Sequence, residues 1–77
     1  MAEHKGHFIL IEAKRPGAAV PMGQQIMFNQ LVKLGFLVIV FWGEDPKIQK
    51  LCVWPNDPIP ANMEDLRKLV ADWYIKS

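Results

Sequence analysis

Apolar and polar positions fall into blocks along this chain, and three of the blocks have the character of β-strands. The first, His7 to Lys14, is rich in β-branched and aromatic residues and is stopped by Pro16-Gly17. The second, Phe36 to Trp42, is apolar throughout, which is typical of a central strand covered on both faces. Ile48 to Trp54 is interpreted as another strand. We therefore predict three strands.

Two further segments have the period of helices. Gly23 to Leu34 carries apolar residues at the spacing of one helical face, namely Met27, Leu31 and Leu34. Gly35 follows at the position of a helix C-cap. Near the other end of the chain, Asn62 and Asp65 form a variant of the capping box. A stripe at helical spacing follows this box and predicts a helix that packs on the sheet: Leu66, Leu69, Val70 and Trp73.

The element order is thus strand, helix, strand, strand, helix, in a single domain over residues 1–77. The first crossover predicts a right-handed βαβ unit that joins parallel neighbours. We expect an α/β (α+β) fold with a small three-stranded mixed sheet and two helices. The stretch "AEHKGH" is interpreted as a hairpin turn only, and "PNDPIP" as a loop whose three prolines forbid regular ladder pairing.

Composition and charge exclude several classes of protein. A chain of 77 residues holds one small domain, and nine basic against eight acidic side chains give no overall field toward nucleic acid or membrane. The single cysteine, Cys52, excludes an internal disulfide and is expected to be a buried thiol. No apolar run is long enough to cross a bilayer, and "MAEHKGH" lacks the apolar core of a signal peptide. We expect a soluble, cytoplasmic protein without membrane contact.

Candidate chemistry lies where the first strand ends. Residues i and i+2 of a strand share a face about 6.5 to 7 Å apart, so Glu12 and Lys14 point the same way. A carboxylate there can hold Mg²⁺ together with substrate oxygens, while the ammonium orients water or offsets developing charge. The same pair also fits a solvated strand end with one ion pair, worth at most about 1 kcal/mol. E-x-K alone leaves both interpretations open.

A longer pattern extends this motif: "FILIEAKRPGAAVPMGQQIMFNQLVKLGFLVIVFWG". It resembles the PD-(D/E)XK nuclease superfamily and, within it, the VRR-NUC type found in phage and repair nucleases. The resemblance covers Gly6 to about Trp54. Family members have an apolar strand that ends in E-x-K, a small Pro/Gly linker, a helix that opens with glutamine, and an apolar strand after a glycine. The resemblance implies a partial restriction-endonuclease-like core in a bacterial or phage-infected cell.

The resemblance also implies roles for individual residues. Glu12 would be a metal ligand, Lys14 the catalytic lysine, and Gln24 the glutamine that supports the site, with Gln25 as the second match. Mg²⁺ or Mn²⁺ would be the cofactor and DNA the substrate of phosphodiester hydrolysis, with structure-specific cleavage as one form of that activity. The positive end of the predicted helix gives a physical reason for phosphate to lie near these glutamines.

One part of the family pattern does not match. The family has an aspartate after a proline on the strand before E-x-K, and often a glutamate from an earlier helix, but Glu3 is the only carboxylate before Phe8. Asp45 and Glu44 are interpreted either as substitute acids or as turn residues. His4 and His7 are interpreted either as phosphate or metal contacts or as exposed turn residues.

We therefore expect a nuclease-like domain whose site is completed by a partner chain. The unpaired edge of the first strand, near Phe8 to Ile11, would recruit another copy of the chain or a different protein. The alternative is a catalytically inactive nuclease-fold module that binds DNA or protein. A small interaction protein, which docks through its apolar sheet edge, is the third interpretation.

Overall fold

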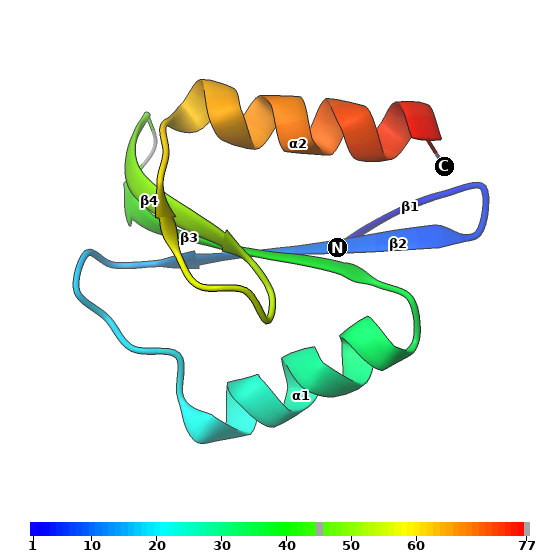
Figure 1. The fold of residues 1–77 in the computed structure, drawn as a ribbon, viewed down its shortest axis with the longest axis horizontal. Coiled ribbons are helices and arrows are strands. Elements are labelled where there is room, and N and C mark those ends of the chain that lie inside the picture. The colour runs from blue at the N-terminus through cyan, green and yellow to red at the C-terminus, as the bar shows by residue number, and fades with distance from the viewer. Residues whose placement is uncertain (45, 77) are drawn as a thin grey trace.

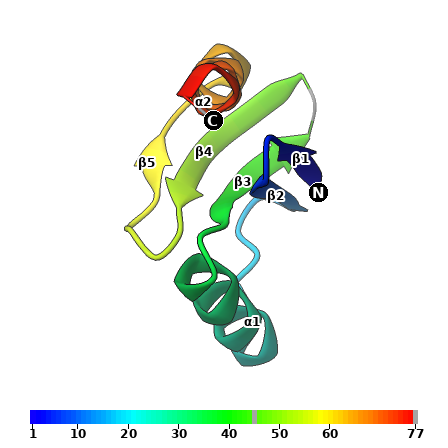
Figure 2. The same cartoon turned by 90° about the vertical axis from the view of Figure 1, so that its right-hand side faces the viewer.

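A five-stranded sheet lies between two helices in the computed structural model, which describes residues 1–44 and 46–76 (Figures 1 and 2). The helices are α1, Met22–Lys33, and α2, Met63–Lys76, and they cover opposite faces of the sheet. The strands are β1 Ala2–His4, β2 His7–Lys14, β3 Leu37–Glu44, β4 Lys47–Val53 and β5 Ile59–Pro60. The α/β class is confirmed, but the expected three-stranded sheet is wrong, because the sheet has five strands.

The strands follow one another across the sheet in the order β1-β2-β3-β4-β5. β2 and β3 are parallel, with Ile9 beside Leu37 and Lys14 beside Trp42, and α1 provides the crossover between them. The other pairs are antiparallel. The parallel pairing that the sequence predicted is therefore confirmed, and it brings the carboxyl ends of β2 and β3 to the same end of the sheet.

The two strands that the sequence analysis missed are short edge strands. β1 pairs with the start of β2 through a two-residue turn in which Lys5 and Gly6 both have positive φ, the geometry that matches the twist of a hairpin. The interpretation of "AEHKGH" as a turn alone was wrong because the residues before the turn also pair. The expectation that "PNDPIP" forms no ladder was also wrong, because Ile59–Pro60 pairs with β4 as β5. Pro60 is tolerated there because β5 is an edge strand, where a missing N–H costs no bond between central strands.

Alternate residues of β3 point to opposite faces of the sheet and pack in two separate cores. One core lies under α2 and contains Ile9, Ile39, Ile48, Leu51 and Leu66. The other lies under α1 and contains Phe28, Val38, Val40, Trp42 and Cys52. The prediction that the apolar run is covered on both faces is confirmed. Burial raises the pKa of the Cys52 thiol, so Cys52 is the neutral structural thiol that the sequence predicted.

A register shift between β3 and β4 reorients the start of β4. Trp42 pairs with Lys50, but Gly43 pairs with Ile48, so one extra β4 residue is accommodated as a bulge. Gly43 has φ +124°, and a Cβ there would lie 2.6 Å from the Lys47 carbonyl oxygen. Glycine is therefore required at this position. The bulge lets Ile48 enter the core under α2 while Lys50 faces the side of α1.

Helix α1 is turned about its axis relative to the sequence prediction. The expected face was wrong in part: Met27 and Leu34 are exposed, whereas Phe28 is fully buried. Leu31 does pack on the core under α1. The helix ends as predicted, because Gly35 has φ +92° and donates to the Val32 carbonyl, while Phe36 N–H donates to the Leu31 carbonyl, the two bonds of a Schellman motif.

Helix α2 agrees with its prediction in both its N-terminal cap and its buried face. Asn62 Oδ1 accepts from the Asp65 N–H, and Asp65 Oδ2 accepts from the Asn62 N–H, both at 2.9 Å. The predicted stripe packs on the core under α2, with Leu66 buried and Leu69, Val70 and Trp73 partly buried. Within the described residues, neither helix is both long and apolar enough to span a membrane.

Candidate active site

Strand β2 presents Glu12 and Lys14 on the face of the sheet that α1 covers. Ile9 belongs to the core under α2, and Leu10 packs on the core under α1, so the even-numbered residues of β2 face α1. Glu12 and Lys14 are both half-buried. The strand therefore holds a carboxylate and an ammonium side by side, at the end where the helix begins.

The loop between β2 and α1 has a defined conformation that positions the start of the helix. Ala18 N–H donates to the Arg15 carbonyl, and Gly17 has φ +79°, which is the type II turn expected for Pro-Gly. The Trp42 indole N–H then donates to the Ala18 carbonyl at 2.6 Å. The end of β3 thus fixes the loop that leads into α1.

Gln24 connects the two charged residues of β2. Its amide Nε2 donates to Glu12 Oε1 at 3.2 Å, and its Oε1 accepts from the ammonium of Lys14. The amide orientation follows from these partners, because a carboxylate only accepts and an ammonium only donates. The structure therefore brings Glu12, Lys14 and Gln24 together in one hydrogen-bonded group.

Gln25, the second match to the family glutamine, has a different contact. Its side-chain Nε2 donates to the Val20 carbonyl at 2.8 Å, so it secures the loop before the helix and does not enter the group at Glu12. Of the two glutamines, Gln24 is thus the one that the fold directs to the strand end.

The amino end of α1 lies at this site without a cap. Pro21 occupies the N-cap position, offers no side-chain acceptor, and no acidic residue lies in the first turn. The first helical bond runs from Gln25 N–H to the Pro21 carbonyl, so the N–H groups of the preceding turn have no partner within the helix. These groups and the helix dipole give the helix end a partial positive charge beside Gln24.

The other candidate residues lie elsewhere or outside the described part. Glu44 ends β3 and lines a pocket with Lys14, so it lies at the same end of the sheet but is not part of the Gln24 group. Asp45 lies outside the described residues. His4 belongs to β1 and stacks on Tyr74 of α2, with ring centroids 3.9 Å apart. The interpretation of His4 as an exposed turn residue was therefore wrong.

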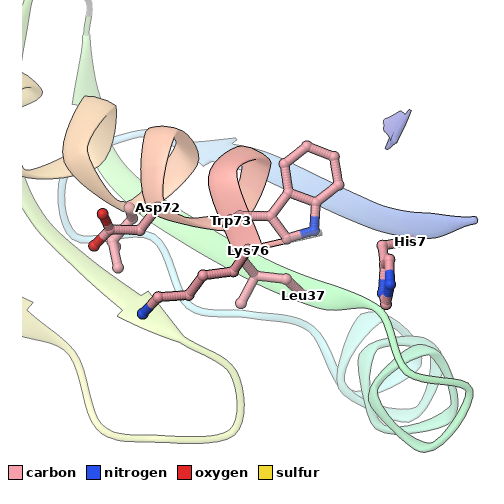
Figure 3. A pocket seen from close by; sticks show the side chains of 6 residues that line it. His7, Leu37, Asp72, Trp73 and Lys76 are labelled. Carbon is pink, nitrogen blue, oxygen red and sulfur yellow. The ribbon is translucent and has the colours of Figure 1, made fainter. Parts of the chain in front are cut away.

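His7 lies at the opposite end of the parallel strands. It lines a pocket with Leu37 of β3 and residues of α2, among them Asp72, Trp73 and Lys76 (Figure 3). His7 opens β2 and is exposed, whereas Glu12 and Lys14 come near its end. The structure therefore does not bring either histidine to the Glu12 group.

Glu12 is the carboxylate that the hydrogen-bonded group at the strand end contains. Glu12 contributes one carboxylate, of which only Oε1 bonds to Gln24, and Mg²⁺ in enzymes is commonly held by one or two carboxylates plus substrate oxygens. Within residues 1–44 and 46–76, no group of three or more His, Cys, Asp or Glu side chains is placed to hold a metal ion. The described residues thus supply one anionic ligand to the site.

Trp42 is a residue of the site that the sequence analysis assigned only to an apolar strand. It has 4% of its surface exposed, and its indole N–H holds the loop between β2 and α1. A tryptophan at the end of an apolar run was the available signal, because a buried indole N–H requires an acceptor.

The edge of β2 is open next to the site. β1 pairs only with His7 to Ile9, and in the described residues no strand adjoins Leu10 to Lys14 on that side. The expectation of an open edge at Phe8 and Ile9 was therefore wrong, and the unpaired stretch begins two residues later.

Comparison with known proteins adds no relative. The chain matches no protein-family model, no curated protein and no solved structure.

Proposed function

We propose that this chain is a VRR-NUC-like domain of the PD-(D/E)XK nuclease type, which acts in divalent-metal-dependent hydrolysis of DNA phosphodiesters. The observation that carries the proposal is the contact of Gln24 with both charged members of E-x-K. A solvated strand end would not require a glutamine from another element to bond both side chains. The positive end of α1 beside them is a second feature suited to a phosphate.

In this proposal Lys14 acts on the water and on the reacting phosphate. The ammonium has three N–H donors, and Gln24 takes one of them. The others are available to orient an attacking water and to stabilise the charge that develops on the phosphate oxygens. Gln24 acts through its partners: it holds the ammonium and the carboxylate in fixed positions, which reduces the reorganisation needed during the reaction.

Glu12 would hold the cation, Mg²⁺ or Mn²⁺, through its carboxylate. A bound divalent cation supplies Lewis acidity at the phosphate and lowers the pKa of a bound water. Gln24 keeps the carboxylate oriented toward the end of the strand by donating to Oε1. The role of Glu12 is thus to place positive charge where the scissile phosphate lies.

The second acid would come from a partner strand on the open edge of β2. The register of β1 places Ala2 opposite Ile9, so a strand that continued β1 backward would place its residues opposite Leu10 to Lys14. Residues directly opposite in an antiparallel pair share a face. A carboxylate opposite Glu12 would therefore lie on the α1 face, within reach of the same cation. Another copy of the chain or a different protein would supply it.

The second candidate function is a nuclease-fold module that binds DNA or protein without cutting. It is favoured by the single carboxylate that the described residues bring to Gln24. The two functions differ in one observable property, cleavage after a second acid has been added.

The test is a nicking assay on supercoiled plasmid with Mn²⁺. A four-residue strand fused before Met1 would pair with Ile11 to Lys14, and aspartate two positions before Met1 would stand opposite Glu12. We expect very weak cleavage by the 77-residue chain and stronger cleavage by this fusion. Glu12→Gln and Lys14→Ala in the fusion should remove the gain.

The matched control moves the aspartate by one residue. Placed directly before Met1, it stands opposite Ile11 and faces α2, so it should not restore cleavage. Strong Lys14-dependent cutting by a monomer of the unfused chain would show that no partner strand is needed. A folded fusion that binds DNA but never cuts would favour the binding module.

A further inference from the structure

Three residues on neighbouring strands form a row next to the candidate active site. Lys14 of β2 pairs with Trp42 of β3, and Trp42 pairs with Lys50 of β4. All three side chains lie on the α1 face: Lys14 bonds to Gln24, Trp42 belongs to the core under α1, and the Lys50 ammonium lies over the Trp42 ring. Because neighbouring strands are about 4.8 Å apart, the two lysine backbones are about 10 Å apart.

The position of Lys50 is determined by the aromatic ring and by the bulge. Its ammonium lies 4.8 Å from the centroid of the Trp42 ring, a cation–π contact. The bulge lies between Ile48 and Lys50, and it turns the Ile48 side chain toward α2. Lys50, the first residue after the bulge, pairs with Trp42 and faces α1. The fold thus holds a half-buried cation on the same face as Lys14.

The described residues give Lys50 no anionic partner. Its ammonium lies over the neutral indole of Trp42, and no carboxylate within residues 1–44 and 46–76 forms an ion pair with it. Lys14 likewise bonds to a neutral amide. Two ammonium groups on one face of the sheet, separated by Trp42 and without an ion pair in the described part of the chain, are suited to an anion with repeated charges.

We propose that Lys50 binds a second phosphate of the DNA strand whose reacting phosphate lies at Lys14, so that this strand runs across the sheet from β2 toward β4. The inference rests on the proposed function for the position of the first phosphate. It adds a binding residue that takes no part in the chemistry, and it gives the direction in which the strand leaves the site.

The test is binding of a fluorescein-labelled single-stranded oligonucleotide, followed by anisotropy in Ca²⁺ so that cleavage is suppressed. Lys50→Gln should weaken binding about fivefold to tenfold at 50 mM salt and lower the slope of log K against log salt by about 0.7, the loss of one phosphate contact. Lys50→Arg should keep both the affinity and the slope. Thermal unfolding of each variant shows whether it is folded.

The matched control is Lys68→Gln, because Lys68 is an exposed lysine of α2, on the opposite face of the sheet. It removes the same charge and should leave the affinity within about twofold, since it lies far from the row. Equal losses in Lys50→Gln and Lys68→Gln would overturn the inference, as would the absence of salt-dependent binding by the wild-type chain.

The outcome separates this inference from the proposed function. Specific loss of binding in Lys50→Gln, together with a fusion that never cuts plasmid, would keep Lys50 as a phosphate contact and remove the nuclease assignment. Cleavage by the fusion with unchanged binding in Lys50→Gln would keep the nuclease and remove Lys50.

Discussion

The two helices of this chain cover the same sheet but begin in opposite ways. Helix α2 starts with reciprocal hydrogen bonds between Asn62 and Asp65, and two acidic residues lie in its first turn. Helix α1 starts at Pro21 with no side-chain cap and no acid in its first turn. Local sequence therefore stabilises the start of α2, whereas the start of α1 depends on contacts from the loop and from β3, through Trp42.

The faces of the two helices differ as well. The apolar stripe of α2 packs on the sheet and leaves Tyr74 and Ile75 exposed. Helix α1 directs Gln24 and Phe28 to the sheet and leaves other large apolar residues exposed: Met22, Ile26 and Met27, with Leu34 at its C-cap. Helix α1 thus differs from α2 in having a hydrogen-bonded polar residue on its sheet side and no side-chain cap at its start. Both features become useful if the end of α1 receives a phosphate. On the proposed function, the start of α1 serves the site, while Phe28 of the same helix and the stripe of α2 both stabilise the fold.

The largest expected effect tests which face of α1 is buried. Phe28→Ala should lower the free energy of unfolding by about 3 to 5 kcal/mol, because it removes a fully buried ring and leaves a cavity. Met27→Ala, one residue earlier and 44% exposed, is the matched control and should change it by less than about 1 kcal/mol. Urea denaturation measures both values. A larger loss for Met27→Ala than for Phe28→Ala would support the buried face that the sequence pattern predicted.

The rotation of α1 away from its predicted face shows where hydrophobic periodicity fails as a predictor. In α1 the apolar residues surround much of the helix, so Met27, Leu31 and Leu34 matched a helical face as well as the true set did. In α2 the polar residues are confined to one side, and the stripe was identified correctly. The edge strands β1 and β5 were missed because three-residue and two-residue ladders depend on their neighbour strand and carry almost no periodic signal of their own.

An intermediate effect tests the cap of α2. Asn62→Ala should lower the free energy of unfolding by about 0.5 to 2 kcal/mol, since it leaves the Asp65 N–H without its acceptor. Gln30→Ala, on an exposed position of α1, is the control and should stay within about 0.5 kcal/mol of wild type. Thermal and urea unfolding should agree. A smaller loss for Asn62→Ala than for Gln30→Ala would mean that α2 does not depend on its capping box.

The candidate site was foreseen from the sequence as a set of residues but not as a geometry. Glu12 and Lys14 share a face because of strand alternation, which holds for any strand. The choice of Gln24 over Gln25 depends on how α1 is rotated and on the Pro-Gly loop, which are tertiary properties. The row of Lys14, Trp42 and Lys50 depends on a bulge that only Gly43 allows, and no sequence period marks it.

The smallest expected effect on stability separates the chemistry from the fold. Lys14→Ala should change the free energy of unfolding by about 0.5 kcal/mol or less, because a half-buried ammonium at a strand end contributes little. When the ammonium is removed, Gln24 Oε1 can accept a hydrogen bond from water instead, and Gln24 Nε2 still donates to Glu12 Oε1. The same substitution should abolish cleavage by the fusion that carries a second acid. Chemical denaturation and the nicking assay are run on the same preparation.

The Lys14→Ala result is interpreted by comparison with Phe28→Ala in α1, which packs on the same face of the sheet. Phe28 contributes to the core and touches no reacting group, so its loss should lower stability in proportion to the cavity. Lys14 contributes a charge at the site and almost nothing to the core, so a folded, inactive Lys14→Ala protein is the expected result. If Lys14→Ala unfolded the chain, the bond to Gln24 would be a structural contact between β2 and α1, and the proposed function would lose the observation that carries it.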